Sequence, residues 1–441
     1  MLILTPKHIS SLSRDELERV LARSSIDLEA VRDRVEEIVR RVRELGDEEI
    51  VRFYEGFYGK KVIDVDTIRV SDEEFSNAYS VVDEELVEAL KTALRNIEEF
   101  HRGQLPKPVW LARISRGVYV GQVWRPIESV GIYVPGGRAS YPSTALMTAV
   151  PAKVAGVKRV IACTPPRPDG TVSPATLVAL DLAGVRDVFK VGGAHAIAAM
   201  AYGTSTVPKV DKVVGPGNIW VATAKQVLRG VIDIDFIAGP TEILIVADGS
   251  ADPYLVALDM VSQAEHDPLA AAVLVTTSKQ LADSVSKFVD EIASRSRRRE
   301  IIEESLKRNG AIIVVDSLEE AFKLANEYAP EHLEVVVSGY SMGEVLDMVG
   351  NAGSIFIGQY TPVALGDYVI GTNHVLPTNM VAKVRGGLSV LDFIKFIDFQ
   401  YVSPEGIKEL GPHAIRIAEA EGLVEHSSSV RARLKRRPNP S

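Results

Sequence analysis

The sequence of 441 residues has a single cysteine, Cys163, and lacks any uninterrupted stretch of about 18 apolar residues. One cysteine excludes an internal disulfide and a zinc site with several thiolate ligands, so a metal ion would be bound by His, carboxylate or amide groups. The chain begins without the basic and apolar regions of an export signal. We therefore expect a cytoplasmic protein with no membrane span.

Positive charge is outweighed by negative charge. The chain has 50 Lys and Arg against 59 Asp and Glu, a net charge of -9, which argues against a nucleic-acid partner. The basic run RARLKRRPNPS at the C-terminal end is typical of a solvated tail. A content of 46% hydrophobic and 25% charged residues is that of a soluble globular protein. The length predicts two or three domains of about 100 to 200 residues.

Two widespread motifs are absent: G-x-G-x-x-G for dinucleotides and H-E-x-x-H for zinc hydrolases. Glycine turns instead follow three strand-like runs, as YVPGG (133–137), VGGAHA (191–196) and GPGN (215–218). Each would let backbone amides approach an anionic or planar ligand at a helix N-terminus. Any one of them is more simply a tight turn between a strand and a helix, but three in one α/β region favour a nucleotide.

Hydrophobic periodicity divides the chain into helical and α/β regions. Apolar residues at three- and four-residue spacing predict an amphipathic helix over 25–45, and roughly the first hundred residues are expected to be mainly helical. Short β-branched runs then alternate with helix-length segments, which indicates parallel sheets covered on both faces. The runs are VGIYVP, RVIACT, DVFKV, KVVGP, FIAGPTEILIVAD, AVLVTT, AIIVVD, LEVVVS and SIFIG. After about residue 385 the chain is expected to be helical again, with Ser403 and Pro404 as start signals.

The segment DMVSQAEHDP (259–268) contains a candidate metal-binding pair. Gln263 and His266 are three residues apart and lie on one face of a helix, so both can point at one ion. Asp367 and His426 would complete a set of donors that suits zinc, although they are chosen by residue type alone. Judged from the residues only, a His near a helix end is more often a surface residue.

The segment YAPEHLEV (328–335) contains a candidate acid-base pair. Glu331 and His332 follow Pro330 at the turn into an apolar strand and could serve as bases for different protons. A polar turn before a buried strand is an equally good interpretation. Cys163 lies inside the run VIACTP, where buried packing is the expected role. If an aldehyde is oxidised here, water must replace the thiol.

Together these segments resemble histidinol dehydrogenase, over nearly the whole chain. The most specific stretches are ESVGIYVPGGRASYPSTALMTAVPAKVAGV, KVVGPGN, AGPTEILIVAD, QAEHDP, YAPEHLEV and GDYVIGTNHVLPT. The resemblance implies an α/β fold with two tandem Rossmann-like three-layer αβα domains, similar to aldehyde dehydrogenases, and helical N- and C-terminal segments. It also implies a homodimer with shared active sites. The expected segments are a helical 1–125, an NAD-binding 126–240, a metal-binding and catalytic 241–384 and a dimerising 385–441.

The resemblance implies a zinc-dependent oxidation of L-histidinol through L-histidinal to L-histidine with two molecules of NAD, the last step of histidine biosynthesis. Implied acid-base residues are Glu331 and His332. The implied zinc ligands, which also contact the substrate, are Gln263, His266, Asp367 and His426. Further implied substrate contacts are Thr241, His332, His374 and Glu421, and implied NAD contacts are Tyr133, His195 and Asn218. The C-terminal segment would bring Glu421 and His426 into the partner's site.

Three positions depart from the family pattern: Thr241 replaces Ser, His195 replaces Gln, and Val363 replaces Glu. Val363 also suggests an alternative, a related dehydrogenase of another small polar alcohol such as a sulfopropanediol. A zinc hydrolase with Glu331 as base is a second alternative, against which the three glycine turns argue. A non-catalytic nucleotide-binding protein is the third, and it would leave Glu331 and His332 without a role.

Overall fold

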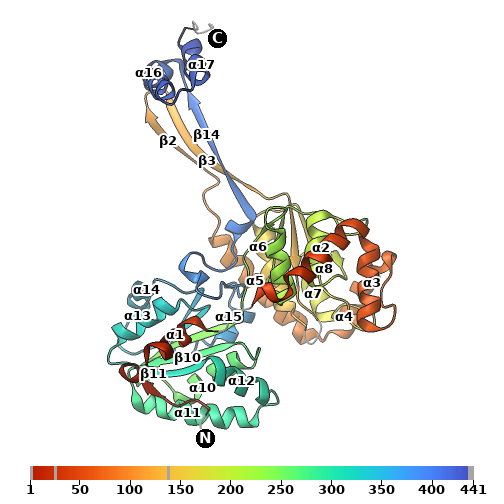
Figure 1. The fold of residues 1–441 in the computed structure, drawn as a ribbon, viewed down its shortest axis with the longest axis vertical. Coiled ribbons are helices and arrows are strands. Elements are labelled where there is room, and N and C mark those ends of the chain that lie inside the picture. Colours follow the sequence, from red (N-terminus) through yellow and green to blue (C-terminus); the bar gives the residue numbers. More distant parts are fainter. Residues whose placement is uncertain (1–2, 24–26, 137–139, 436–441) are drawn as a thin grey trace. The chain divides into compact units, whose positions relative to one another are not determined.

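The computed structural model describes residues 3–23, 27–136 and 140–435. The chain forms two compact units, one of Met1–Gln104 with Glu128–Asp392 and one of Leu105–Ile127 with Phe393–Ser441 (Figure 1). The first unit holds two parallel sheets, and the second holds one antiparallel sheet. Within the described residues, none of the helices combines the length and apolar character needed to cross a membrane.

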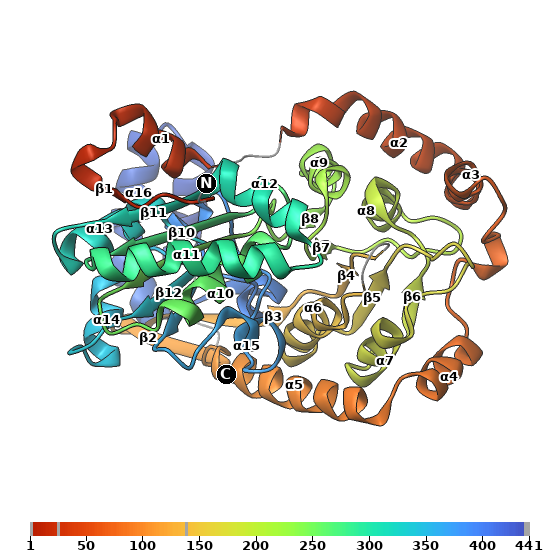
Figure 2. The same cartoon turned by 90° about the horizontal axis from the view of Figure 1, so that it is seen from below.

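A five-stranded parallel sheet forms one half of the first unit. Its strands, in spatial order, are β6 (Asp187–Phe189), β5 (Arg159–Cys163), β4 (Ser129–Tyr133), β7 (Lys212–Val214) and β8 (Asp233–Ile234). Helices α6 (Pro142–Val154) and α7 (Pro174–Leu182) cover one face, and α8 (Gly193–Tyr202) and α9 (Ile219–Leu228) cover the other (Figure 2). The strands are apolar on both sides because both faces are covered.

A six-stranded parallel sheet forms the other half of this unit. Its strands, in spatial order, are β1 (Lys7–His8), β11 (Gly310–Val314), β10 (Ala271–Thr276), β9 (Glu242–Ala247), β12 (His332–Val336) and β13 (Ser354–Ile357). One face packs on α10 (Pro253–Ala264), α11 (Lys279–Arg295) and α12 (Arg299–Asn309). The other packs on α1 (Arg14–Ala22), α13 (Leu318–Tyr328) and α14 (Met342–Met348). Two covered parallel sheets confirm the predicted fold class, and every predicted strand run contains a strand.

The N-terminal region is helical, as predicted. Its helices are α2 (Arg32–Leu45), α3 (Asp47–Tyr58), α4 (Asp72–Val81) and α5 (Glu84–Gly103). The helix expected over 25–45 starts as a 3-10 turn at Leu28–Val31, and the beginning of that range lies outside the described residues. Helix α2 buries Val35, Val39 and Val42 against α8 and α9. These helices therefore form an outer layer on the five-stranded half.

The second unit is a three-stranded antiparallel sheet followed by two helices. The strands are β2 (Val109–Ser115), β3 (Val118–Pro126) and β14 (Ile394–Val402), with β3 in the centre. Ser403 caps α16 (Pro404–Ala420), as predicted, and α17 (Val424–Lys435) packs on it. The three strands were not predicted. The domain borders proposed from the sequence stay predictions.

Candidate active site

The acid-base candidates lie at the amino-terminal edge of the six-stranded sheet. Thr241 directly precedes β9, and His332 is the first residue of β12, which pairs in parallel with β9. Helix α13 ends where Ala329 adopts a left-handed backbone conformation with φ 50°, and Pro330 prevents the helix from continuing. In this sheet the turns that lead into the strands carry the polar side chains.

Glu331 is buried and tied to the start of β9. Its Oε2 accepts hydrogen bonds from the Thr241 hydroxyl at 2.6 Å and from the backbone N–H of Glu242 at 2.9 Å. Burial raises the pKa of Glu331 to about 7, although the neighbouring His332 charge and the two hydrogen bonds act in the opposite direction. A carboxyl group with such a pKa can exchange a proton near neutral pH.

His332 is held in one tautomer. Its Nδ1 lies 3.0 Å from the backbone carbonyl of Glu242, which only accepts, so Nδ1 carries a proton. Its Nε2 is buried, finds no hydrogen-bond partner among the described residues, and lies 3.6 Å from Asp367 Oδ1. Burial lowers the pKa of His332, but the carboxylates of Glu331 and Asp367 outweigh this and raise it to about 9. Neutral His332 would therefore accept a proton on Nε2.

Asp367 and His374 lie together beside His332. Asp367 belongs to the short helix α15 (Val363–Tyr368), and His374 Nδ1 donates to its backbone carbonyl at 2.9 Å. This leaves His374 Nε2 to accept a hydrogen bond from the hydroxyl of Thr144, at 3.3 Å. Thr144 comes from α6 of the five-stranded half and was not among the residues selected from the sequence. The pair Thr144 and His374 thus connects the two halves of the first unit.

Gln263 and His266 lie at the end of α10. The Gln263 side chain is buried and its amide nitrogen donates to the Thr241 hydroxyl, which directs the amide oxygen away from Thr241. His266 lies just beyond the helix and is exposed. Partial desolvation lowers its pKa, while the carboxylates of Asp367 and Glu265 act to raise it. Nowhere in the described ranges are three His, Cys, Asp or Glu side chains grouped so that they could hold a metal ion.

Glu421 and His426 lie in the second unit. Glu421 caps the C-terminus of α16, His426 belongs to α17, and both are exposed. They line one groove of about 690 Å³ together with apolar residues that include Ile417 of α16 and Leu423 of the turn between the helices. The second unit therefore brings these two predicted residues to one surface.

The three predicted NAD contacts line a single cavity of about 430 Å³ at the carboxyl edge of the five-stranded sheet. The Tyr133 hydroxyl accepts a hydrogen bond from the backbone N–H of Gly193 at 3.2 Å, and Asn218 caps the N-terminus of α9. His195 stacks on Phe53, with ring centroids 4.0 Å apart. The aromatic wall from α3, which also includes Phe57, was missed, since α3 gives only a helical packing pattern in the sequence.

Cys163 is the last residue of β5 and is fully buried. Burial raises the pKa of its thiol far above the usual range, so it carries no thiolate at neutral pH. This agrees with the packing role predicted for it.

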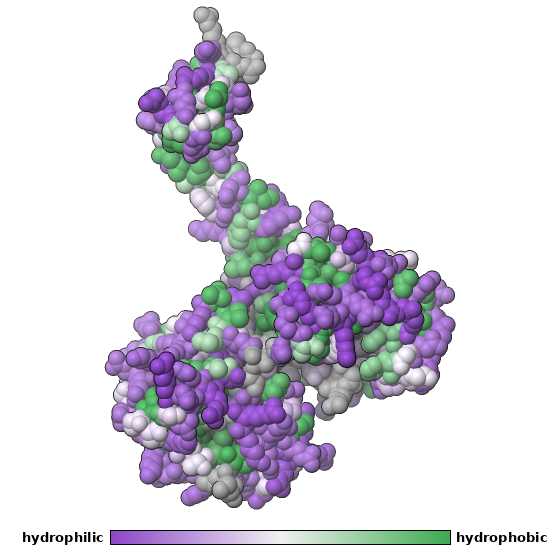
Figure 3. Space-filling view, in the orientation of Figure 1, coloured by the Kyte–Doolittle hydropathy of each residue, from purple (hydrophilic) through white to green (hydrophobic). Residues whose placement is uncertain are grey.

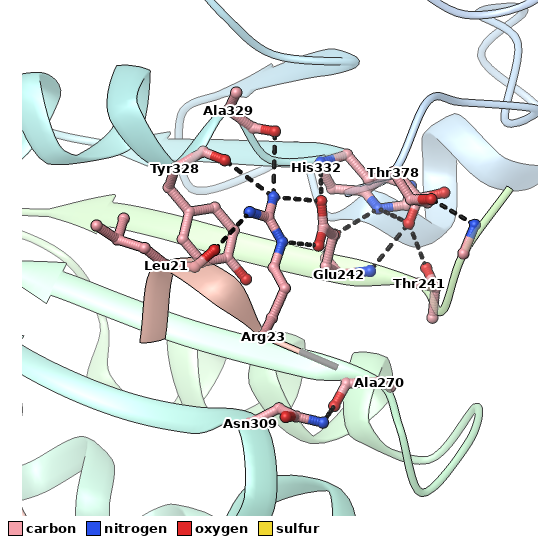
Figure 4. A network of polar contacts seen from close by, with 12 residues as sticks. Leu21, Arg23, Thr241, Glu242, Ala270, Asn309, Tyr328, Ala329, His332 and Thr378 are labelled. Carbon is pink, nitrogen blue, oxygen red and sulfur yellow. Dashed lines mark hydrogen bonds and ion pairs between the residues drawn. The ribbon is translucent and has the colours of Figure 1, made fainter. Parts of the chain in front are cut away.

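A buried ion pair, also missed, supports the acid-base candidates (Figure 4). The Arg23 guanidinium forms a two-pronged pair with the carboxylate of Glu242, and the side chains are each 2% exposed. Arg23 follows α1, in the region that the sequence predicts to be mainly helical. Its partner is 219 residues away in the chain, which no local pattern reveals.

Comparison with known proteins identifies the family of this chain. A family model described as histidinol dehydrogenase matches residues 21–434. The chain belongs to the histidinol dehydrogenase family. A histidinol dehydrogenase from Methanosarcina mazei is 48% identical over 439 residues and covers 100% of both chains. One from Methanocaldococcus jannaschii is 46% identical and covers 97% of this chain and 98% of its own.

The fold is that of a histidinol dehydrogenase as well. A crystal structure of histidinol dehydrogenase from Elizabethkingia anophelis superposes with a TM-score of 0.93, at 36% identity and 99% coverage of each chain. The resemblance seen in the sequence is therefore confirmed, and the protein is placed in an oxidoreductase family.

The departures from the histidinol dehydrogenase pattern have different structural consequences. Thr241 retains the hydroxyl that bridges Gln263 and Glu331, so its extra methyl group changes no hydrogen bond. His195 is buried, and burial lowers its pKa to about 4, which keeps the ring neutral against Phe53. Val363 is 4% exposed and belongs to the apolar cluster on one face of the six-stranded sheet. At that position a Glu side chain would either turn out of this apolar cluster or be buried within it.

Proposed function

We propose that the protein oxidises L-histidinol through L-histidinal to L-histidine, with NAD as oxidant and zinc as the ion that holds the substrate. The observation that carries this proposal is the arrangement of Glu331 and His332. They are adjacent, buried and anchored to β9, and the Nε2 atom of His332 is the open base atom. Similarity to histidinol dehydrogenases along the full chain supports the choice of substrate.

His332 acts as the base of both oxidations. Its fixed Nδ1–H leaves Nε2 to take the hydroxyl proton of the alcohol while the carbon-bound hydrogen leaves with its electron pair. A bound NAD would supply the acceptor for that hydride. The first oxidation thus converts the alcohol to the aldehyde and releases one proton.

Glu331 acts on water between the two oxidations. Its carboxylate removes a proton from the water molecule that adds to the aldehyde carbon. The aldehyde oxygen takes up the proton that His332 gained in the first oxidation, which gives the hydrate and leaves His332 neutral. His332 then takes a hydroxyl proton of the hydrate, and loss of a second hydride gives the carboxylic acid. Because Cys163 is buried and protonated, no thiol is available to form a thioester in its place.

The donor chemistry of four residues fits zinc. Gln263 offers an amide oxygen, Asp367 offers a carboxylate, and His266 and His426 offer imidazoles. The lowered pKa of His266 keeps its imidazole neutral, as a metal ligand must be. Zinc, when bound, would hold the amino and imidazole nitrogens of the substrate and fix its orientation. Asp367, once its charge is neutralised by a cation, raises the pKa of His332 less, so that the imidazole can accept a proton at neutral pH.

The cavity at the five-stranded sheet suits a dinucleotide. Helices α8 and α9 begin at its edge, and their N-terminal backbone N–H groups favour phosphate oxygens. The aromatic side chains of α3 and Trp220 provide flat apolar surfaces for stacking. We place NAD there, in contact with Tyr133, His195 and Asn218.

The second unit supports a homodimer. Its sheet and helices expose many large apolar side chains, whereas soluble monomers rarely expose large apolar patches (Figure 3). Examples are Trp110, Leu111, Phe396, Ile417 and Leu423. In the proposed dimer these faces pair, and the copy of Glu421 and His426 in one subunit completes the active site of the other.

An absorbance assay tests the proposal. Purified protein loaded with zinc is mixed with NAD and either L-histidinol or a sulfonated diol, and NADH formation is followed. We expect NADH with L-histidinol, at two equivalents per histidine formed. NADH with the diol alone would reject the substrate and point to the effect of Val363, and zinc-loaded protein that forms NADH with neither would reject the dehydrogenase itself.

A further inference from the structure

Glu242 makes three hydrogen bonds to the acid-base residues. Its backbone N–H donates to Glu331 Oε2 at 2.9 Å, and its carboxylate Oε1 accepts from the Glu331 backbone N–H at 3.2 Å. Its backbone carbonyl accepts from His332 Nδ1 at 3.0 Å. Glu242 therefore contacts the reactive ends of both residues, and the Thr241 hydroxyl is a second donor to Glu331. Glu242 itself touches neither substrate nor cofactor in the proposed function.

Arg23 in turn fixes Glu242. Its Nη2 donates to Glu242 Oε1 at 2.6 Å, and its Nε donates to the other carboxylate oxygen. The same guanidinium donates to the backbone carbonyls of Tyr328 at 2.9 Å and Ala329 at 3.3 Å, and lies 3.8 Å from the centroid of the Tyr328 ring (Figure 4). Arg23 thus joins the start of β9 to the end of α13, from which Glu331 follows three residues later.

The backbone conformation of Arg23 indicates that the surrounding structure holds it in the ion pair with Glu242. Its φ of 41° is a conformation that non-glycine residues rarely adopt, and it persists where surrounding contacts fix it. The side chain makes those contacts, with bonds to Glu242, Tyr328, Ala329 and Leu21. A buried ion pair often contributes little net stability compared with apolar side chains of the same size, because both charges lose their hydration. Stability alone therefore does not account for it.

Charge gives a second reason for the pair. Burial raises the pKa of Glu242, and the hydrogen bonds and charge of Arg23 oppose this rise. The groups that face Glu331 are His332 beside it, Glu242 and Thr241 from the start of β9, Tyr328 from α13 and Arg23. Arg23 is the permanent cation among them. Without it, Glu331 would lie beside an uncompensated carboxylate, and its proton would be bound more tightly.

From these contacts we infer that Arg23 and Glu242 are positioning residues for the reaction: the buried pair sets the place of Glu331 and His332 and the charge around Glu331. This inference rests on the proposed acid-base roles of Glu331 and His332. Arg23 reaches the site from the segment after α1, so the N-terminal region takes part in the chemistry indirectly.

The test compares variants of the full-length, zinc-loaded enzyme, with kcat, KM for L-histidinol, zinc content and the pH profile of kcat for histidinal oxidation measured on each. For Arg23→Met we expect kcat to fall about 10- to 100-fold, with zinc content and KM near wild type. The acidic limb should move to higher pH, because Glu331 must lose its proton to act as a base. Combining Arg23→Met with Glu242→Gln should return the acidic limb of the pH profile to its wild-type position. Glutamine removes the uncompensated negative charge of Glu242 and keeps an oxygen that accepts the hydrogen bond from the Glu331 N–H.

Arg23→Lys keeps the inference testable if Arg23→Met does not fold. Lysine retains the charge but cannot bond both carboxylate oxygens and both carbonyls at once, so kcat should fall while the limb stays in place. Lys212→Met is the matched control, because it removes a buried cation paired with Asp233 at the amino end of β7. We expect it to change thermal stability but neither kcat per folded, zinc-bound enzyme nor the pH limb.

Two results would overturn the inference. One is an unchanged kcat and pH limb in Arg23→Met and Arg23→Lys. The other is a loss of activity that only follows the loss of folded, zinc-bound protein, as in the control. Glu331→Gln and His332→Asn separate this from failure of the proposed function. If those two variants keep full turnover, the acid-base roles are wrong, whereas if they are inactive and the Arg23 variants are not, only the positioning role is wrong.

Discussion

The hydroxyl of Thr144 lies 3.3 Å from Nε2 of His374, and these residues come from opposite halves of the first unit. Nδ1 of His374 is already bonded to the carbonyl of Asp367, so Thr144 is the donor that sets the other side of the ring. A proposed substrate contact on the six-stranded half is therefore oriented by a helix of the five-stranded half. The two halves must keep their spacing for His374 to face the substrate.

Thr144→Val tests this relationship, since it keeps the shape of the side chain and removes the hydroxyl. A lost neutral hydrogen bond is worth about 1 kcal/mol, so we expect kcat/KM for L-histidinol to fall roughly five- to tenfold, mainly through KM. Thr144→Ser, which keeps the donor, should stay near wild type. Equal kinetics for the Val and Ser variants would show that the hydroxyl has no role in substrate binding.

His332→Asn should separate the base from the metal ligands. Asparagine has no basic nitrogen in place of Nε2 to take the hydroxyl proton, so turnover should fall by roughly 10²- to 10⁴-fold. Zinc content, measured by atomic emission on the purified protein, should be unchanged. Loss of the metal from this variant would count against its role as a base.

The pH dependence should report Glu331 when L-histidinal is supplied as substrate. Burial raises the pKa of Glu331 to about 7, and the residue acts as a base only when it has lost its proton. The rate of histidinal oxidation should therefore rise as the pH increases through about 7 and level off above it. Glu331→Gln should abolish most of this rate and its acidic limb, and a variant that keeps the limb would assign it to another group.

His426→Asn should lower the affinity for zinc, because asparagine lacks the imidazole nitrogen that is proposed to bind the ion. We expect a decrease of about tenfold or more, measured by competition with a chelator. His413→Asn, at an exposed position of α16, is a suitable control. Unchanged zinc binding in His426→Asn would exclude it as a ligand.

Mixed dimers test whether sites are shared. One subunit carries His332→Asn and the other carries His426→Asn. If His426 enters the site of the other subunit, one of the two active sites of the heterodimer contains both histidines and the other contains neither. We expect refolded mixtures to recover up to about half of the activity per heterodimer. Purified heterodimers without activity would show that each site is built from one chain.

The sequence predicted the α/β regions because their strands are buried on both faces and read as continuous apolar runs. It did not predict β14, in which apolar side chains occupy both faces of an exposed strand, Phe396 and Ile397 being adjacent and both exposed. Their pattern fits neither a core strand nor an amphipathic helix. In the proposed dimer a second subunit covers this surface of β14, which accounts for apolar side chains on both of its faces.

The candidate site was predicted in its residue types more than in its architecture. Glu331 and His332 stand out because two polar groups precede a buried strand. Arg23 and Thr144 do not, since an arginine after an amphipathic helix and a threonine in an apolar one are both ordinary. Their roles follow from partners more than 200 residues away, and only the folded chain brings these together.

Strand β1 gives the first unit a chain path with a practical consequence. Residues 7 and 8 form the edge of the six-stranded sheet next to β11, whereas the helices from α2 to α5 belong with the five-stranded half, and the chain reaches β9 only at residue 242. No single cut of the polypeptide yields the two halves as whole fragments. A fragment that starts after β8 would lack its outermost strand and the Arg23 side chain, so dissecting this enzyme requires a circularly permuted gene or co-expression of three pieces.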